Sequence, residues 1–308
     1  MNLPFDLDLS GKTAVVTGAG GVLCSMFAKV LAQCGAKTAI LDLNLEAAQK
    51  VADEITAEGY AAKAYKANVL DKEVMEEVHK AVLADFGPCD ILINGAGGNN
   101  PRATTANEYY FPGDIDKDIA NFFNLDKDGV SFVFNLNFLG TLIPTQVFAQ
   151  DMLTREGCNI LNISSMNAYT PLTKIPAYSG AKAAISNFTQ WLAVHFSKVG
   201  IRVNAIAPGF FVTKQNQALL FNEDGTPTPR TGKILAATPM ERFGKPEELV
   251  GALMFLLDNA AASFVTGVVI PVDGGFSASG HAVQQRRARL LALHLQTKPV
   301  KCRLLFVV

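Results

Sequence analysis

The sequence has few of the residues that would suggest a metal site, a disulfide framework or a nucleic-acid partner. Five cysteines are scattered over 308 residues without a Cys-x-x-Cys pair, and four histidines lack ligand spacing, so we expect free thiols and no metal. The net charge of −1 favours neither nucleic acid nor an anionic membrane as a partner. We expect no apolar run to reach the length of a membrane span, and the first eight residues lack a signal-peptide pattern, so a cytoplasmic protein is predicted.

Apolar residues are plentiful, and their arrangement predicts the fold. They make up 49% of the chain, enough for one large core. Short β-branched runs alternate with helical patterns, which predicts a single doubly wound Rossmann-type α/β domain: a mostly parallel sheet with helices on both faces. Strands are expected at 13–17, 37–42, 62–66, 91–94, 159–163, 202–206 and 268–272, and helices at 22–34, 45–58, 72–86 and 178–199, with another around Asn137.

Two long segments and a tail interrupt this alternation. Residues 99–128 and 216–241 each follow the carboxyl end of a predicted strand, where ligands bind in parallel sheets, so both are predicted to be substrate loops. Residues 284–308 contain six basic residues and no acidic one. That composition differs from the rest, so we expect the domain to span 1–283 and the tail to be an extension introduced by cloning or a frame shift, or a disordered segment, rather than a functional tail.

The most informative pattern is Tyr178 followed four residues later by Lys182. On a helix these positions share a face, and a nearby ammonium is expected to lower the phenol pKa from its usual value of about 10. Ser165 lies upstream and could hold a substrate oxygen beside the phenol. This set suits proton exchange with an alcohol or a ketone. An ordinary exposed helix pair would show the same spacing.

A glycine-rich turn between the first predicted strand and helix indicates a nucleotide site. Gly18, Gly20 and Gly21 would let backbone N–H groups approach a pyrophosphate at the helix amino terminus. Asp42 ends the next strand, where a carboxylate binds ribose hydroxyls and repels a 2′-phosphate, which favours NAD over NADP; a turn residue or a helix cap is the alternative. The other predicted contacts lie at strand ends or in the first helix: Val22, Leu23, Leu43, Asn68, Val69, Asn94, Ala96 and Gly97.

Taken together and in order, these motifs resemble the short-chain dehydrogenase/reductase family over about residues 9–280. The matching residues are Thr17-Gly18, Asn94-Gly95-Ala96-Gly97, Asn137, Ser165, Tyr178, Lys182, Pro208-Gly209, Thr213 and Asp273-Gly274-Gly275. The resemblance implies a single domain, NAD(H) as cofactor, and hydride transfer to or from a carbon that bears oxygen. It also implies a homodimer or homotetramer.

The resemblance implies a role for each residue of the site. Tyr178 would be the acid/base, Lys182 would lower its pKa and bind the nicotinamide ribose, and Ser165 would orient the substrate oxygen. Asn137 resembles the asparagine that holds a water in the proton relay, with Asn135 as a nearby rival. The serine could instead only end a strand. The residues expected around the carboxamide are Pro208, Gly209, Phe211 and Thr213.

The sequence departs from the family pattern at the nucleotide end. Val22 and Cys24 occupy the later two glycine positions of the first turn, Gly95 replaces the usual second asparagine, and Asn68 replaces an aspartate. Cys24 places a side chain where close packing against the cofactor is expected, which concerns cofactor affinity more than cofactor identity.

Within the family, the chain resembles a bacterial subgroup assigned as D-mannonate oxidoreductases, or fructuronate reductases. The resemblance lies in residues 18–23, residues 94–101 and the long segment 99–128 before Asn137. This implies a sugar acid reduced or oxidised at C5, which requires a cation and several hydroxyl partners. The candidates are Asn99, Asn100, Arg102, Asn167, Lys174, Gln215, Asn216 and Arg230. A gluconate-type 5-dehydrogenase, a general carbonyl reductase and a non-enzymatic dinucleotide sensor are alternatives; a sensor need not keep the proton relay.

Overall fold

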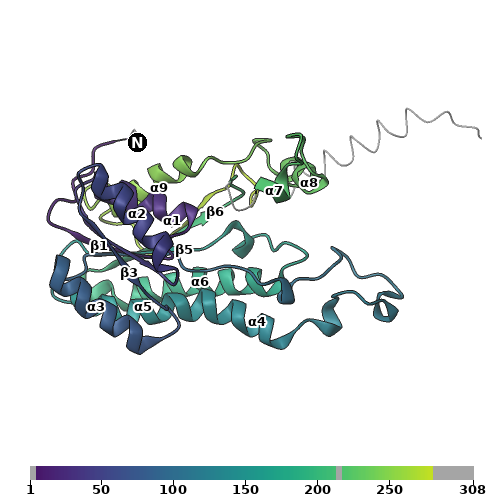
Figure 1. Cartoon of the computed structure of the whole chain (residues 1–308), viewed down its shortest axis with the longest axis horizontal. Helices are drawn as coiled ribbons and strands as arrows, with labels where there is room; N and C mark the ends of the chain where they lie inside the picture. Colours follow the sequence, from purple (N-terminus) through teal and green to yellow (C-terminus); the bar gives the residue numbers. More distant parts are fainter. Residues whose placement is uncertain (1–4, 213–216, 280–308) are drawn as a thin grey trace, which may run out of the picture.

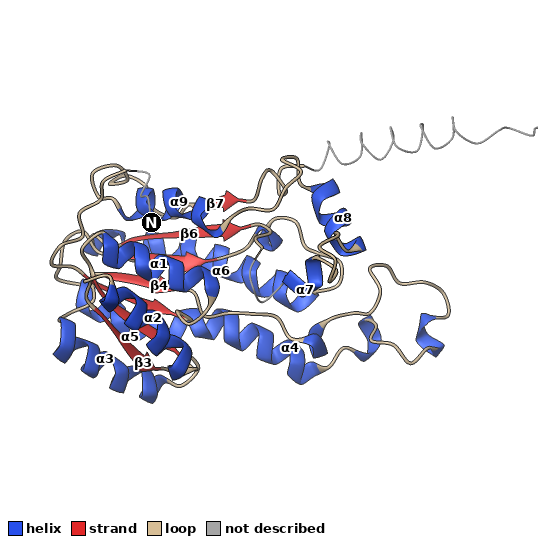
Figure 2. Cartoon of the chain, turned by 45° about the horizontal axis from the view of Figure 1, so that its top comes forward, coloured by secondary structure: helices blue, strands red, loops and turns tan. Residues whose placement is uncertain are grey.

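A computed structural model describes residues 5–212 and 217–279. Within them, one parallel sheet has the strand order β3-β2-β1-β4-β5-β6-β7 (Figure 2). The strands are β1 Thr13–Thr17, β2 Lys37–Asp42, β3 Ala62–Lys66, β4 Ile91–Asn94, β5 Asn159–Ile163, β6 Arg202–Pro208 and β7 Val269–Val272. The order reverses between β1 and β4, so the predicted doubly wound sheet is confirmed. The predicted tail 284–308 and the candidates Thr213, Gln215 and Asn216 lie outside the described residues.

Helices cover both faces of the sheet (Figure 1). They are α1 Val22–Gln33, α2 Leu45–Ala57, α3 Lys72–Phe86, α4 Lys127–Phe134, α5 Gly140–Phe148, α6 Pro176–His195, α7 Gln217–Leu220, α8 Pro229–Ala237 and α9 Val250–Leu257. Because side chains alternate along a strand, a central strand must be apolar on both sides. In β1, Ala14 and Val16 pack in the core with α1, α2 and α9, while Val15 packs in the second core with α3, α5 and α6.

A buried polar chain crosses the carboxyl end of the sheet. The Asn94 Nδ2 donates to Thr145 Oγ1 at 3.0 Å and to Asn162 Oδ1 at 2.9 Å. The Asn162 Nδ2 in turn donates to Thr189 Oγ1 at 2.9 Å. Buried polar groups are costly unless paired, so these bonds hold β4 and β5 in register with α5 and α6.

The helices α4 and α5 are joined by one turn of π-helix, Asn135–Leu139. The stretch Lys127–Met152 is long and apolar enough to cross a membrane by length and composition, with a mean hydropathy of 1.3. The expectation that no segment passes this test was therefore wrong. Half of this stretch is buried within the protein, where Val133, Val147 and Phe148 pack in the cores, so its apolar character is that of a core helix.

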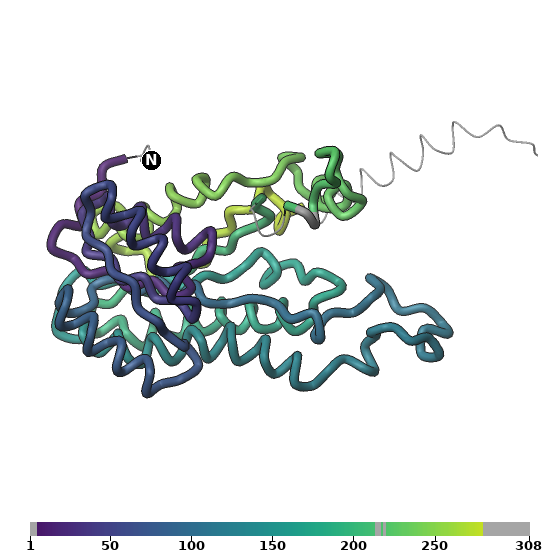
Figure 3. Tube along the Cα trace, in the orientation of Figure 1, coloured from purple at the N-terminus to yellow at the C-terminus, as the bar shows by residue number. Residues whose placement is uncertain are grey.

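The first of the two long segments, residues 99–128, is an insertion that projects beyond the carboxyl end of the sheet (Figure 3). It contains three short 3-10 turns, Pro101–Ala103, Asp114–Asp116 and Phe122–Asn124. Asp114 is buried and organises the outer part, because its carboxylate accepts hydrogen bonds from Lys117 Nζ at 2.7 Å and from the Phe111 backbone N–H at 3.0 Å.

The second insertion, which the structure describes over residues 217–241, contains α7 and α8 and contacts the first insertion. Lys233 of α8 forms an ion pair with Glu108 at 2.6 Å. The backbone N–H of Thr105 also donates to the Lys174 carbonyl at 2.9 Å, which joins the first insertion to the loop before α6. Three segments far apart in the sequence therefore meet above the carboxyl ends of the strands.

Candidate active site

Two backbone turns meet at the ends of β1 and β4. The Thr17 hydroxyl accepts hydrogen bonds from the Gly95 N–H at 3.1 Å and the Ala96 N–H at 3.2 Å. Gly18 has a φ of 65°, and a Cβ there would lie 2.9 Å from the Ala96 backbone. Glycine is therefore required at position 18, both for its conformation and for the close approach. The sequence indicates Thr17 only as part of a motif, because its partners are far away in the sequence.

Asp42 lies beside the first turn, at the position predicted for ribose binding. Its carboxylate accepts hydrogen bonds from the Gly20 N–H and the Asn44 N–H, both at 2.9 Å. The cap of α2 is Asn44, whose side chain accepts from the Ala47 N–H at 3.2 Å. Asp42 is therefore not the helix cap, but it is also a turn residue, because its carboxylate accepts from the N–H two residues on. The same half-buried carboxylate faces the glycine turn.

Two of the four departures from the family pattern, Cys24 and Gly95, lie against each other. A Cβ at Gly95 would overlap the Cys24 thiol and lie 3.0 Å from the Thr17 carbonyl oxygen. The Cys24 side chain is buried, and burial raises the pKa of its thiol to about 12. The cysteine occupies space that a side chain at position 95 would otherwise fill, so the two substitutions compensate for one another.

Other predicted cofactor residues differ in how they could contribute. The Asn94 side chain is buried in the polar chain described above, so at most its backbone reaches the site. The Asn68 Oδ1 accepts from the Leu70 N–H at 3.1 Å, and Leu43 is 65% exposed. The other predicted cofactor residues lie at or near the ends of strands or at the start of α1: Gly18, Gly20, Gly21, Val22, Leu23, Val69, Ala96, Gly97, Pro208, Gly209 and Phe211.

Lys182 and Tyr178 lie one turn apart on α6. The Lys182 Nζ is 5.7 Å from the centre of the Tyr178 ring and donates to the Ile163 carbonyl at 2.8 Å, at the end of β5. Lys182 is only 4% exposed, and this burial lowers the pKa of its ammonium to about 8. The lysine is therefore protonated at neutral pH.

The phenol of Tyr178 has a raised pKa. Burial of the phenol raises it, and the hydrogen bond with Ser165 opposes this shift by lowering the pKa. The sequence predicts a lowered pKa, because Lys182 lies one helical turn away. The predicted direction is wrong for this structure, because desolvation of the phenol outweighs the hydrogen bond with Ser165.

Asn137 reaches the site from the π-helical turn. Its Nδ2 donates to the carbonyls of Gly98 and Val133, both at 2.8 Å, and its Oδ1 accepts from the Gly98 N–H at 3.3 Å. A Cβ at Gly97 would lie 2.6 Å from the Asn137 Oδ1 and 3.2 Å from the Lys182 Nζ. Asn135 is exposed, so only Asn137 of the two candidates faces the site. Such π-turns are frequent at functional sites.

Ser165, rather than its neighbour Ser164, lies beside Tyr178. The Ser164 hydroxyl is buried against α6, within 2.7 Å of the Ser186 hydroxyl. The Asn167 side chain, predicted to contact substrate, is buried and donates to the Ser165 Oγ at 3.2 Å.

The remaining substrate candidates are spread over the three loops. Arg102 forms an ion pair with Asp126 at 2.8 Å, so its charge is partly satisfied. The Asn99 side chain donates to the Thr104 hydroxyl at 3.0 Å. Lys174 and Arg230 are exposed, on the loop before α6 and on α8.

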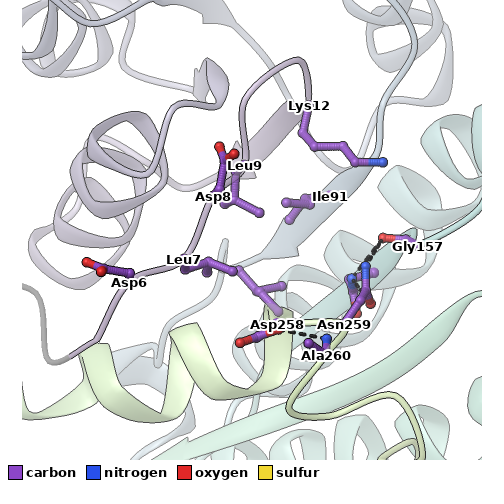
Figure 4. Close-up of a pocket in the computed structure, with 12 residues that line it drawn as sticks. Asp6, Leu7, Asp8, Leu9, Lys12, Ile91, Gly157, Asp258, Asn259 and Ala260 are labelled. Carbon is purple, nitrogen blue, oxygen red and sulfur yellow. Dashed lines mark hydrogen bonds between the residues drawn. The ribbon is translucent and has the colours of Figure 1, made fainter.

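A cavity of about 260 Å³ lies away from these residues, at the amino-terminal end of the strands (Figure 4). Lys12, Ile91 and Asn159, which precede or begin β1, β4 and β5, are among its lining residues. It contains none of the residues predicted from the sequence, so the cavity is separate from the candidate active site.

Comparison with known proteins agrees with this geometry. Residues 12–224 match the family model for short chain dehydrogenase. An "Uncharacterized oxidoreductase" from Haemophilus influenzae is 65% identical over 278 residues, 90% of this chain and 97% of that protein. A Haemophilus crystal structure provisionally assigned as a D-mannonate oxidoreductase, with bound NAD, is also 65% identical; the match covers 88% of this chain and 97% of that one, with a TM-score of 0.85. Gluconate 5-dehydrogenase from Gluconobacter oxydans is 34% identical over 91% of this chain and all of that protein.

The chain therefore belongs to the short-chain dehydrogenase family, and it is an oxidoreductase of alcohol and carbonyl groups.

The contact between Cys24 and Gly95 predicts coupled stabilities. Gly95→Ala should destabilise the protein by about 1–3 kcal/mol, because the new methyl group overlaps the thiol. Adding Cys24→Gly should recover most of this loss, although the Thr17 carbonyl still crowds the methyl. Urea unfolding of both single variants and the double variant measures the coupling. Gly98→Ala is the control, because its nearest neighbour would be 3.9 Å away. Strictly additive losses would contradict the contact.

The buried ammonium of Lys182 predicts a pH-dependent stability. Its pKa falls from 10.5 to about 8 on folding, so between these values the unfolded chain binds more protons and the stability of the wild type rises with pH. Lys182→Met lacks that rise. The stability of the variant relative to the wild type should fall by up to about 3 kcal/mol across this window, at about 1.4 kcal/mol per pKa unit. Unfolding free energies at pH 7 and 10 measure the change; a constant difference would show that Lys182 is solvated.

Proposed function

We propose that the protein is an NAD-dependent oxidoreductase that interconverts D-fructuronate and D-mannonate. The observation that carries the proposal is the 65% identity, over 97% of its length, to the Haemophilus protein whose crystal structure has that provisional assignment and holds NAD. The gathering of Asn137, Ser165, Tyr178 and Lys182 supports catalysis and argues against a non-enzymatic sensor, which would not need a proton relay.

The residues present fit a dinucleotide. The turns after β1 and β4 form a cradle for the cofactor, in which Gly18 and Gly97 leave space because they lack side chains. A Cβ at Gly18 would contact Ala96, and one at Gly97 would contact Asn137 and Lys182. The backbone of Gly18–Leu23 would hold the pyrophosphate at the amino terminus of α1. The Asp42 carboxylate would bind the ribose hydroxyls and repel a 2′-phosphate, which favours NAD. NAD(H) supplies or accepts the hydride when it is bound.

The remaining side chains handle the substrate oxygen and its proton. In the reductive direction the Tyr178 phenol donates a proton to the C5 oxygen, and its raised pKa keeps it protonated at neutral pH. Ser165 orients that oxygen. Lys182 would bind the nicotinamide ribose and, as a cation beside the Tyr178 ring, stabilises the phenolate that remains. Asn137 holds a water next to Lys182, through which the proton is restored.

The sugar-acid part of the substrate would be bound by the two insertions. Their ion pair, Lys233 with Glu108, and the bond from Thr105 to the loop before α6 bring polar groups of three segments together. We propose Lys174 and Arg230 as the first candidates for the substrate carboxylate, since Arg102 already pairs with Asp126. The similarity to gluconate 5-dehydrogenase favours a gluconate-type 5-keto acid as the second candidate substrate.

The proposal includes a homodimer or homotetramer in the cytoplasm. Large apolar side chains are exposed on α4 and α6: Phe132 is 44% exposed, Trp191 55% and Val194 76%. Such side chains are typical of surfaces that another subunit covers.

The proposed activity is tested by following NADH oxidation with D-fructuronate, 5-ketogluconate and an apolar ketone. We expect the highest kcat/KM with fructuronate, and a higher kcat/KM with NADH than with NADPH because of Asp42. Lys174→Ala and Arg230→Ala test the carboxylate site: losing a charged hydrogen bond of about 1.5–3 kcal/mol lowers kcat/KM about ten- to a hundred-fold.

The outcomes separate the parts of the proposal. Reduction of the apolar ketone without turnover of either sugar acid would overturn the sugar-acid assignment, and a preference for NADPH would overturn the role of Asp42. If fructuronate is reduced and neither alanine variant differs from the wild type, only the carboxylate site is wrong.

A further inference from the structure

We propose that Asn167 is a positioning residue that forces the Ser165 hydroxyl to donate its hydrogen bond toward Tyr178 and the substrate oxygen. From the sequence, Asn167 is predicted to contact the substrate. In the structure its side chain is 7% exposed and lies behind Ser165, in the short turn Met166–Ala168 that follows β5. The inference rests on the proposed catalytic roles of Ser165 and Tyr178, but not on the identity of the sugar acid.

The backbone determines which way the Asn167 amide faces. The Leu172 N–H points at one end of this amide at 3.3 Å. A backbone N–H can only donate, so that end must be the oxygen Oδ1. The other end, the Nδ2, therefore faces the Ser165 Oγ at 3.2 Å and donates to it. Reversing the amide would place two donors against each other at Leu172.

The Ser165 hydroxyl then has both of its acceptor positions in use. Besides the Nδ2 of Asn167, the backbone N–H of the same residue donates to the Ser165 Oγ, also at 3.2 Å. A hydroxyl has one hydrogen to donate and two lone pairs that accept. With both lone pairs engaged, the hydrogen must point away from Asn167, toward the side of Ser165 where Tyr178 lies.

A serine restricted to donation suits the proposed chemistry. A ketone oxygen and a phenolate both need a donor, and a serine that accepted from Tyr178 instead would stabilise the neutral phenol. Ser165 lies beside the Tyr178 phenol, and a hydrogen bond donated by the serine lowers the pKa of that phenol. The charged group beside this pair is Lys182, on the same helix as Tyr178.

The test is Asn167→Asp, which is nearly isosteric. The carboxylate still accepts from the Leu172 N–H, so the loop keeps its bond, but the group that faces Ser165 now accepts instead of donating. The serine hydrogen is then drawn to the new carboxylate and away from the substrate. We expect kcat/KM to fall about ten- to a hundred-fold, close to the effect of Ser165→Ala. Asn167→Leu, which removes the donor without adding a charge, should also lower kcat/KM.

The matched control is Asn167→Asp in the Ser165→Ala background. If Asn167 acts through Ser165, the double variant should be no slower than Ser165→Ala alone. Effects that multiply in the double variant would show that Asn167 acts on the substrate directly, and would overturn the proposal. So would a single Asn167→Asp variant within about threefold of the wild type, a smaller loss than one hydrogen bond to a charged group.

A readout without substrate keeps this test separate from the proposed activity. Ultraviolet titration of phenolate absorbance, as the difference between each protein and its Tyr178→Phe counterpart, reports the pKa of Tyr178 alone. We expect the pKa to rise in Ser165→Ala, because the phenolate loses its donor, and to rise by a smaller amount in Asn167→Leu, because the serine hydroxyl is then free to turn away from the phenolate. A purely structural role for Asn167 predicts no rise. A shifted pKa in a protein that turns over no sugar acid would support the inference while the proposed substrate fails.

Discussion

The site depends on the close approach of two backbone turns at the point where the sheet changes direction. The hydroxyl of Thr17 binds the N–H groups of the turn after β4, and Gly18 adopts a left-handed conformation in contact with Ala96. No side chain fits between them, so the backbone itself forms the surface on which the dinucleotide is proposed to lie. The same approach explains why Cys24 is tolerated where a glycine is usual: Gly95 leaves room for its thiol.

Burial on the side of the site that holds α6 determines the protonation of the proposed catalytic groups. Lys182 is held by the Ile163 carbonyl, and Asn137 is held by the backbone of Gly98, so both are fixed before any substrate arrives. Burial raises the pKa of Tyr178, and it lowers the pKa of Lys182 only to about 8, so both groups are protonated at neutral pH before the reaction begins. A protonated phenol is the form that donates to a substrate oxygen, and the ammonium beside it stabilises the phenolate that this donation leaves.

Most of the fold could be predicted from local patterns, because β-branched runs and glycine turns depend on neighbours in the sequence. The strand bounds agree within two residues, and the helix that carries Tyr178 begins two residues earlier than expected, at Pro176. The parts that differ depend on contacts between distant residues. No local signal indicates that Asn167 lies behind Ser165, that Gly95 makes room for Cys24, or that burial of the Tyr178 phenol outweighs its hydrogen bond with Ser165.

The central claim is that the Tyr178 phenol transfers the proton in a cradle that binds the cofactor independently. Tyr178→Phe removes one oxygen and leaves the ring beside Lys182 in place. Turnover of fructuronate should fall about a hundred- to ten-thousand-fold, while the dissociation constant for NADH, measured by fluorescence, changes little. Turnover within a few-fold of the wild type, with NADH still bound, would contradict the account.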